Sequence, residues 1–252
     1  MKKFVSLALA LLMLVVMLPV VSLADDTNYC TIEGIDGKFD TLTAAAKAWR
    51  ESKQVVTEGS TFGGHPAELT EVDAIAWSIY GTVSVGDGAG VVGSNGAGNC
   101  IFDGGYLTPS VIINKVTVNG YSNATIIGDP YRVSSGAKDV TFTNITFANT
   151  MRNDSDPASL TFTNCTFKAD LRIPHAKENA ALKVENCTFT GEAGGDYAIF
   201  VQGNMADVSI SGNNISGYQR GMNIQTAPAT VSITNNTITN LTGKAGDDGT
   251  TY

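Results

Sequence analysis

The chain has 252 residues, enough for one large domain or two small ones. Its 16 basic residues stand against 24 acidic ones, which gives a formal net charge of −8 and an isoelectric point near 4.7. Binding to the phosphates of a nucleic acid normally requires the opposite balance, so this composition argues against that partner. A hydrophobic content of 43 % can supply a core, which excludes wholesale disorder.

Residues 1–24 have the three parts of a secretory signal peptide. Two lysines precede an apolar run over residues 4–21, and small residues at positions 22 and 24 precede Asp25. A retained membrane anchor is the alternative, because an apolar run of this length could just span a bilayer. The pattern favours export, so we expect a secreted or bacterial cell-surface protein whose mature chain begins at Asp25.

An amphipathic helix is predicted over residues 40–52, with Asp40 or Thr41 as its N-terminal cap. Apolar side chains recur there at intervals of three and four residues, at Leu42, Ala45, Ala46 and Trp49. Residues 74–85, farther along the chain, alternate in the manner of one or two strands.

One eight-residue pattern recurs from residue 140 onward. Apolar residues occupy its first, third and eighth places, and Asn or Gly occupies its fifth. The copies are VTFTNITF (140–147), LTFTNCTF (160–167), LKVENCTF (182–189), VSISGNNI (208–215) and VSITNNTI (231–238). Their starts lie 20, 22, 26 and 23 residues apart. A degenerate earlier copy over 116–127, VTVNGYSNATII, fits if about four residues are inserted at its turn.

This repeat predicts an all-β fold, a right-handed parallel β-helix, with the predicted helix covering its first coil. The first and third places alternate with polar residues, which is the period of a strand. Asn and Gly tolerate the left-handed backbone angles of a bend. An antiparallel sandwich is the alternative, but its hairpins would not repeat the same strand–bend–strand pattern. In a β-helix each coil adds one rung, and equivalent places stack about 4.8 Å apart.

Stacking predicts rows of like side chains along the solenoid. Three inward rows are expected: Val140, Leu160, Leu182, Val208 and Val231; Phe142, Phe162, Val184, Ile210 and Ile233; and Phe147, Phe167, Phe189, Ile215 and Ile238. An amide ladder is expected at the bend, where stacked amides can bond one another and the turn backbone. Its members are Asn144, Asn164, Asn186 and Asn235.

The pattern divides the chain into a signal peptide (1–24), an N-terminal cap with the first irregular coils (25–110) and regular coils (111–252). The last coil stops without a cover, which favours a fragment of a longer protein. Cys165 and Cys187 occupy the same place on adjacent coils, and the stacking distance favours two free thiols over a disulfide. Cys30 could pair with Cys100, which the sequence leaves open. None of the cysteine spacings fits a zinc site.

The repeat sequences VTFTNITF, LTFTNCTF and VSITNNTI resemble the coil repeats of the pectin-lyase-like superfamily of right-handed β-helix proteins, and the resemblance covers about residues 111–252. That resemblance implies either a polysaccharide lyase or hydrolase, or a secreted bacterial surface protein without catalysis. The repeat is specific for the fold and says little about function.

Four arginines form the least ordinary pattern in the repeat. Arg132, Arg152, Arg172 and Arg220 each lie five residues after a residue expected to point inward, namely Ile127, Phe147, Phe167 and Ile215. Gly194 takes that place in the remaining coil. Two such charges 4.8 Å apart repel by ~0.9 kcal/mol in water and ~3.5 kcal/mol at an effective dielectric of 20. The nearby acids Asp129, Asp154 and Asp170 can neutralise the row. Otherwise its guanidinium groups suit the carboxylates or sulfates of an acidic glycan.

Evidence for catalysis is weaker. His65 and His175 have no companion at catalytic or metal-ligand spacing, and the acidic pairs Asp154/Asp156 and Asp247/Asp248 lack a matching basic motif. We therefore expect no metal and no cofactor. The sequence favours a non-enzymatic, adhesin-like β-helix module of the cell surface that binds acidic glycans or a surface partner. The alternative is a lyase or glycoside hydrolase acting on acidic polysaccharide.

Overall fold

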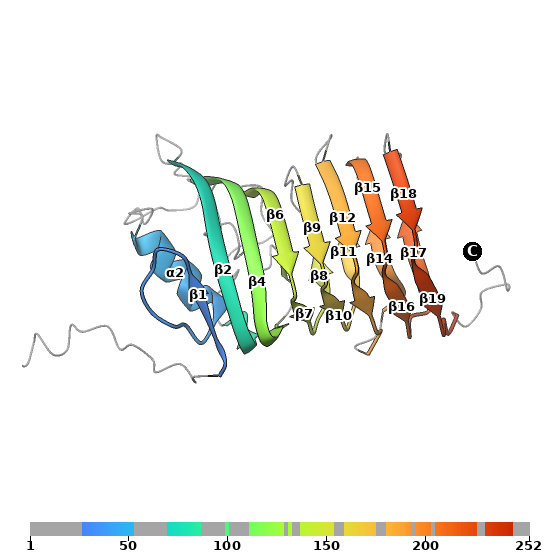
Figure 1. The fold of residues 1–252 in the computed structure, drawn as a ribbon, viewed down its shortest axis with the longest axis horizontal. Coiled ribbons are helices and arrows are strands. Elements are labelled where there is room, and N and C mark those ends of the chain that lie inside the picture. The colour runs from blue at the N-terminus through green and yellow to red at the C-terminus, as the bar shows by residue number, and fades with distance from the viewer. Residues whose placement is uncertain are drawn as a thin grey trace, which may run out of the picture.

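The chain folds into a parallel β-solenoid, with one helix beside its N-terminal end (Figure 1). This confirms the predicted parallel β-helix with a helix near its N-terminus. The computed structural model describes residues 27–52, 70–86, 99–100, 111–128, 131–132, 137–153, 159–174, 180–192, 195–202, 205–225 and 230–243. The proposed signal peptide lies outside these residues.

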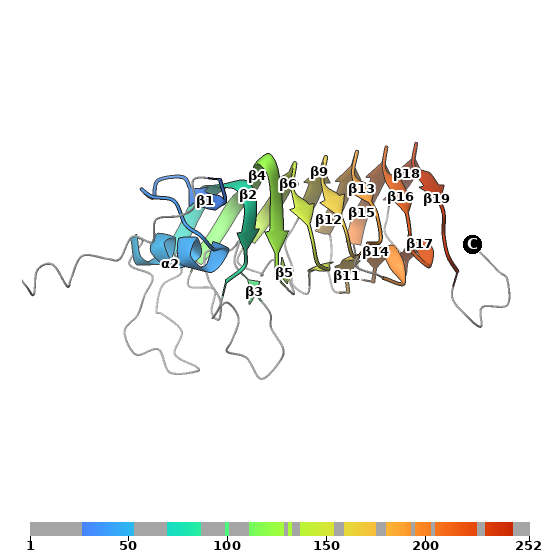
Figure 2. The same ribbon diagram turned by 90° about the horizontal axis from the view of Figure 1, so that it is seen from below.

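Each coil crosses three walls of parallel strands. The first and second walls belong to one continuous 13-stranded sheet, and the third wall is a separate six-stranded sheet. Figure 2 shows the third wall running along one side of the solenoid. The first wall contains β2 (Thr70–Ser84), the beginning of β4 (Val111–Ile127), β6 (Ala137–Thr143), β9 (Ser159–Thr163), β12 (Ala180–Glu185), β15 (Met205–Ser211) and β18 (Thr230–Thr234).

The two other walls are made of shorter strands. The second wall contains the end of β4, β7 (Thr146–Phe147), β10 (Thr166–Phe167), β13 (Thr188–Phe189), β16 (Asn214–Ser216) and β19 (Thr237–Thr239). The third wall contains β3 (Asn99–Cys100), β5 (Tyr131–Arg132), β8 (Met151–Arg152), β11 (Leu171–Ile173), β14 (Tyr197–Val201) and β17 (Arg220–Ile224). One further strand, β1 (Tyr29–Ile32), pairs antiparallel with β2 at the N-terminal end.

Helix α2 (Leu42–Ser52) lies beside β1 and β2 at the start of the solenoid (Figure 1). Its apolar stripe is buried as predicted, with Leu42, Ala45, Ala46 and Trp49 at most 7 % exposed. The Thr41 hydroxyl accepts a hydrogen bond from the Ala44 amide at 3.1 Å, so Thr41 is the N-cap. The Thr43 hydroxyl donates to the Val85 carbonyl oxygen at 2.6 Å and ties the helix to the first coil.

The strand register confirms the three predicted rows, and their members are buried from Val140 to Ile215, whereas Val231, Ile233 and Ile238 in the last described coil are 44–49 % exposed. Val140, Leu160, Leu182, Val208 and Val231 pair in sequence; so do Phe142, Phe162, Val184, Ile210 and Ile233, and likewise Phe147, Phe167, Phe189, Ile215 and Ile238. The rows extend back into β4 at Val116, Val118 and Ile126. In the degenerate copy the sequence placed Ile127 inward, and this is wrong: Ile126 is fully buried and Ile127 is 40 % exposed.

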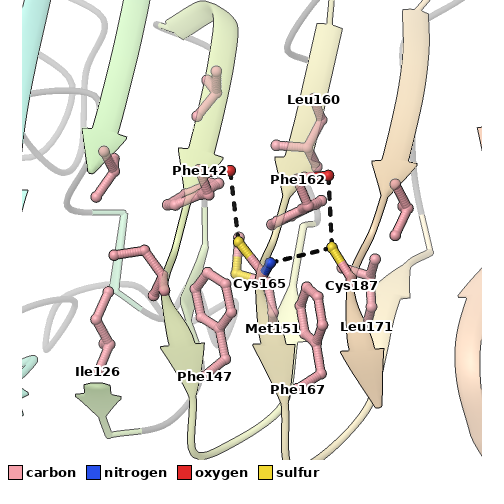
Figure 3. Packing of buried hydrophobic residues seen from close by; sticks show 14 of the residues in the cluster. Ile126, Phe142, Phe147, Met151, Leu160, Phe162, Cys165, Phe167, Leu171 and Cys187 are labelled. Atoms are coloured by element: carbon pink, nitrogen blue, oxygen red, sulfur yellow. Dashed lines mark hydrogen bonds between the residues drawn. The ribbon is translucent and has the colours of Figure 1, made fainter. Parts of the chain in front are cut away.

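Phenylalanine rings fill the middle of the core in two stacks (Figure 3). Phe142 and Phe162 stack with centroids 5.2 Å apart, and Phe147 and Phe167 stack at 5.1 Å. The Phe142 and Phe147 rings meet edge to face at 5.4 Å. Both geometries are favourable for aromatic pairs, so this core gains specific packing as well as apolar burial.

The bend between the first and second walls uses left-handed residues on successive coils. Asn144, Asn164, Asn186 and Asn235 have φ angles of 53° to 58°, and Gly212 takes the same place with φ of 68°. The backbone amides of Asn144, Asn164 and Asn186 each donate to the next coil, at 3.0 to 3.1 Å. The four asparagine side chains are exposed, so the bend stacks them in register but turns their amides outward.

The buried amide ladder lies one place farther along each coil. Asn213 donates from Nδ2 to the Val184 carbonyl oxygen at 3.1 Å and to Asn236 Oδ1 at 2.8 Å, and its Oδ1 accepts from the Cys187 amide at 2.8 Å. Asn236 in turn donates to the Ile210 carbonyl oxygen at 2.8 Å. Side chains at this place satisfy backbone groups that the bend leaves unpaired.

Cys165 and Cys187 occupy that same place, and both are buried free thiols, as predicted. The Cys165 amide donates to Cys187 Sγ at 3.4 Å, and the two thiols donate to the Phe142 and Phe162 carbonyl oxygens at 3.5 and 3.6 Å (Figure 3). Burial raises the pKa of the Cys165 thiol well above its usual range. Cys30 is also a buried free thiol, and burial raises its pKa to about 12.

Candidate functional site

Two of the predicted arginines stack on the outer side of the third wall. Arg152 on β8 pairs directly with Arg172 on β11, between inward residues that are fully buried. Tyr131 pairs with Met151, so the backbone of Arg132 lies beside that of Arg152. The three-arginine row on successive coils is therefore present in the strand register. Only the side chains of Arg152 and Arg172 belong to the described part of the chain.

An aromatic residue, rather than a glycine, continues this row. Phe200 on β14 pairs with Arg172, and the guanidinium carbon of Arg172 lies 5.0 Å from the centre of the Phe200 ring. The expectation that Gly194 takes this place is wrong, although Gly194 itself lies outside the described residues. The segment before β14 is longer than its equivalents in the earlier coils, so a count of five residues from Phe189 stops too early.

Arg220 belongs to a neighbouring row of the same wall. It pairs with Tyr197, its guanidinium carbon lies 5.3 Å from the centre of the Tyr197 ring, and its Nη1 donates to the Tyr197 hydroxyl at 3.0 Å. The Tyr197 and Phe200 rings are 5.9 Å apart. The expected four-arginine row is thus corrected to three arginines followed by Phe200, with Arg220 one row aside.

Together these side chains form a continuous surface, which we call the arginine–aromatic face. It consists of Arg152, Arg172, Phe200, Tyr197 and Arg220. Each arginine–ring contact falls within the ~6 Å range of a cation–π interaction, which holds the guanidinium groups in place on an otherwise flexible side chain. The face joins positive charge to flat apolar rings along four successive coils, from β8 to β17.

Asp170 is an acid that contacts this face directly. Its Oδ2 accepts a hydrogen bond from Arg172 Nη1 at 3.3 Å, and the two side chains are 6 % and 39 % exposed. The pKa of Asp170 is raised to about 6, chiefly by burial and to a smaller extent by the Asp196 charge, while the Arg172 charge and hydrogen bond lower it in part. Among the described residues, Asp170 Oδ1 has no hydrogen-bond partner. A nearby acid therefore offsets part of the Arg172 charge, as the neutralised-row alternative requires.

Sequence reasoning missed the two rings and the burial of the acid. Tyr197 and Phe200 lie on one outer face although they are three residues apart, because Ala198 and Ile199 between them are both buried. This irregularity breaks the strand period of two. Asp170 was considered only as a local partner, and its burial comes from the close approach of Gly195, where a Cβ atom would overlap Oδ1.

Several other candidates fall outside the described residues: His65, His175, Asp154, Asp156, Asp247 and Asp248. Within the described part, no three His, Cys, Asp or Glu side chains come together as metal ligands. No helix among the same residues has the length and apolar character needed to cross a bilayer.

The chain was compared with known proteins at three levels. It matches no protein-family model, no curated protein and no solved structure. The solenoid and its side-chain geometry are therefore the basis for any assignment of function.

Proposed function

We propose that this chain is a non-enzymatic, exported surface module that binds acidic glycans through its arginine–aromatic face. The observation that carries the proposal is the direct pairing of Arg152 with Arg172 and its continuation by Phe200 on one outer wall. The β-helix repeat also supports the proposal that this chain is one of the secreted, adhesin-like members of the pectin-lyase-like superfamily.

The chemistry of the face suits a chain of sugar acids. A guanidinium group matches a carboxylate or sulfate with two parallel hydrogen bonds. Tyr197 and Phe200 offer flat apolar surface on which the C–H side of a sugar ring can pack, and Tyr also carries a polar tip. An extended glycan running along the solenoid meets these groups one coil at a time.

The charge of the whole protein opposes this binding, since the formal net charge is −8. Attraction must therefore come from the local field of the face and must weaken with salt, because the Debye length falls to about 8 Å at physiological ionic strength. Salt dependence separates this proposal from binding driven by apolar contact alone.

A binding experiment with charge-matched variants tests the proposal. The double variant Arg152→Ala/Arg172→Ala is expected to bind polygalacturonate or dextran sulfate at least tenfold more weakly than the unmodified protein in co-sedimentation. The control, Lys115→Ala/Lys183→Ala, removes the same charge from the first wall, where both lysines are exposed. Equal losses in both variants, or no binding by the unmodified protein, would overturn the proposal.

Catalysis on the same polysaccharides is the second candidate, and the Asp170–Arg172 pair favours it. A carboxyl group with a pKa of about 6 beside an arginine is a reasonable acid or base. Its 6 % exposed side chain argues against direct contact with a substrate. Absorbance near 235 nm and reducing ends, measured with and without calcium, decide the matter: either signal, lost in Asp170→Asn, would establish the enzyme in place of the binding module.

A further inference from the structure

A second surface lies at the bend between the first and second walls, where β4 has a longer bend than the coil that follows it. Asn119 pairs with Thr143 and Thr125 pairs with Thr146, so β4 has five residues where the next coil has two. Ser122 and Asn123 in the extra segment have φ angles of 53° and 60°. We call this longer bend, residues 120–124, the ridge.

Three tyrosines stack at this ridge, and Tyr121 is one of its residues. Tyr29 and Tyr80 are 4.5 Å apart, Tyr80 and Tyr121 are 5.1 Å apart, and both ring pairs are inclined by only 18°. Lys38 Nζ lies 4.2 Å from the centre of the Tyr29 ring and covers that end of the stack. Tyr121 at the other end is 46 % exposed. Because Tyr80 covers one side of the Tyr121 ring, its other side is turned toward the following coils.

A hollow of about 310 Å³ lies on that side of Tyr121. Its volume is at the lower end of the range for small-molecule sites. Its lining side chains are uncharged, and they include Tyr121, Ser122, Asn144, Thr146, Asn164 and Thr166. The exposed left-handed asparagines of the bend thus supply amides to one wall of the hollow, opposite the tyrosine ring.

We propose that this hollow binds one ring of a neutral sugar chain. The apolar side of the ring packs on the free face of Tyr121, and the sugar hydroxyls exchange hydrogen bonds with the amides of Asn144 and Asn164 and with the neighbouring threonine hydroxyls. An acidic sugar is disfavoured here, because no cation lines the hollow to replace the water lost by its carboxylate. This site is independent of the acidic glycan proposed for the arginine–aromatic face.

The ridge also borders a second hollow, of about 620 Å³, whose lining includes Tyr29, Tyr80 and the shared Ser122 and Asn123. A sugar chain that crosses the ridge would contact both hollows. Hexasaccharides are therefore expected to bind more tightly than the corresponding monosaccharides.

The test uses saturation-transfer NMR of the unmodified protein with cellohexaose, xylohexaose, mannohexaose and chitohexaose. At least one is expected to bind, Tyr121→Ala is expected to reduce its affinity at least fivefold, and Tyr121→Phe is expected to retain it. Asn164→Gly removes one amide from the hollow while allowing its positive φ, and is expected to weaken binding severalfold. Asn186→Gly makes the same change one coil beyond the hollow and is the matched control.

Each result supports or contradicts the site. Binding lost in Tyr121→Ala and Asn164→Gly but kept in Asn186→Gly, with an unchanged circular dichroism melting curve, supports it. No binding of any of the four hexasaccharides, or equal binding by Tyr121→Ala, overturns it. Polygalacturonate binding by Tyr121→Ala, which is expected to be unchanged, shows separately whether the arginine–aromatic face functions.

Discussion

At the scale of single residues, burial dominates the chemistry of Asp170. The Arg172 charge lowers the pKa of this carboxyl, but desolvation raises it by more, so the group titrates near pH 6. The folded state therefore holds the proton more tightly than the unfolded chain does. Stability from this group is greatest at acid pH, and it is lost as the pH rises from about 4 to about 6.

Replacing the acid by its amide is expected to remove this pH dependence. Between pH 4 and pH 7 the unmodified protein should lose at most about 3 kcal/mol of unfolding free energy through Asp170, and Asp170→Asn should lose none of it. Urea unfolding at several pH values measures the difference between the two proteins. Glu192→Gln serves as the control, because Lys168 lowers the pKa of that exposed carboxyl and its effect has the opposite sign. Parallel pH profiles for Asp170→Asn and the unmodified protein would contradict the assignment.

At the scale of the strand and its bend, side-chain rows carry most of the cohesion of the fold. Phe162 on β9 is fully buried, stacks on Phe142 and meets Phe147 and Phe167 edge to face. Its neighbours belong to coils fixed by their own hydrogen bonds, so they cannot collapse fully into a cavity. Shortening the Phe162 side chain is therefore expected to destabilise the folded state strongly.

Phe162→Ala is expected to lower the free energy of unfolding by about 3–5 kcal/mol, as measured by urea denaturation. Thr161→Ala, at the adjacent outward place on the same strand, is expected to change it by less than about 0.5 kcal/mol. A loss below about 1 kcal/mol for Phe162→Ala would show that this core is loosely packed.

The same rows explain how much of the fold the sequence could predict. Where coils have equal spacing, the period of two and the shared bend identify the residues that stack, and the register of the three rows from Val140 to Ile238 is correct; the members in the last described coil are about half exposed. Where a coil carries extra residues, the count fails: Ile127 was placed inward instead of Ile126, and Phe200 was missed as the neighbour of Arg172. An insertion changes which residues of neighbouring coils pair, but it leaves the eight-residue repeat unchanged. The sequence therefore does not show where the inserted residues are accommodated, and the backbone pairing does.

The candidate sites were less predictable than the fold for the same reason. The pairing of Arg152 with Arg172 follows from the repeat, but both tyrosine-lined surfaces depend on irregular segments. Tyr197 and Phe200 share a face because of two consecutive buried residues, and Tyr121 lies in the widened bend of β4. The asparagines at the bend were predicted as a ladder, yet their outward direction depends on the left-handed backbone that Asn adopts there.

At the scale of the whole molecule, the solenoid is a stack of exchangeable coils. Among the described strands, each coil pairs with the coils next to it, so the stability of the solenoid is a sum of local terms. Deleting residues 160–181 removes one complete coil and brings Phe142 beside Val184 and Phe147 beside Phe189, as the rows require.

This 22-residue deletion is expected to leave a folded β-protein with a cooperative thermal transition measured by circular dichroism. Deleting residues 160–170, about half a coil, would carry each later strand onto the wrong wall and is expected to abolish that transition. If both deletions unfold the protein, or if both leave it folded, the coils are not exchangeable units.

Pairing restricted to adjacent coils also determines how the molecule responds to a pulling force. Tension along the solenoid axis loads each rung in series, so the weakest rung gives way first while the others stay intact. One released coil of 20 to 26 residues becomes an extended thread about 65–90 Å long. Such a molecule lengthens in discrete steps and dissipates mechanical work at each step.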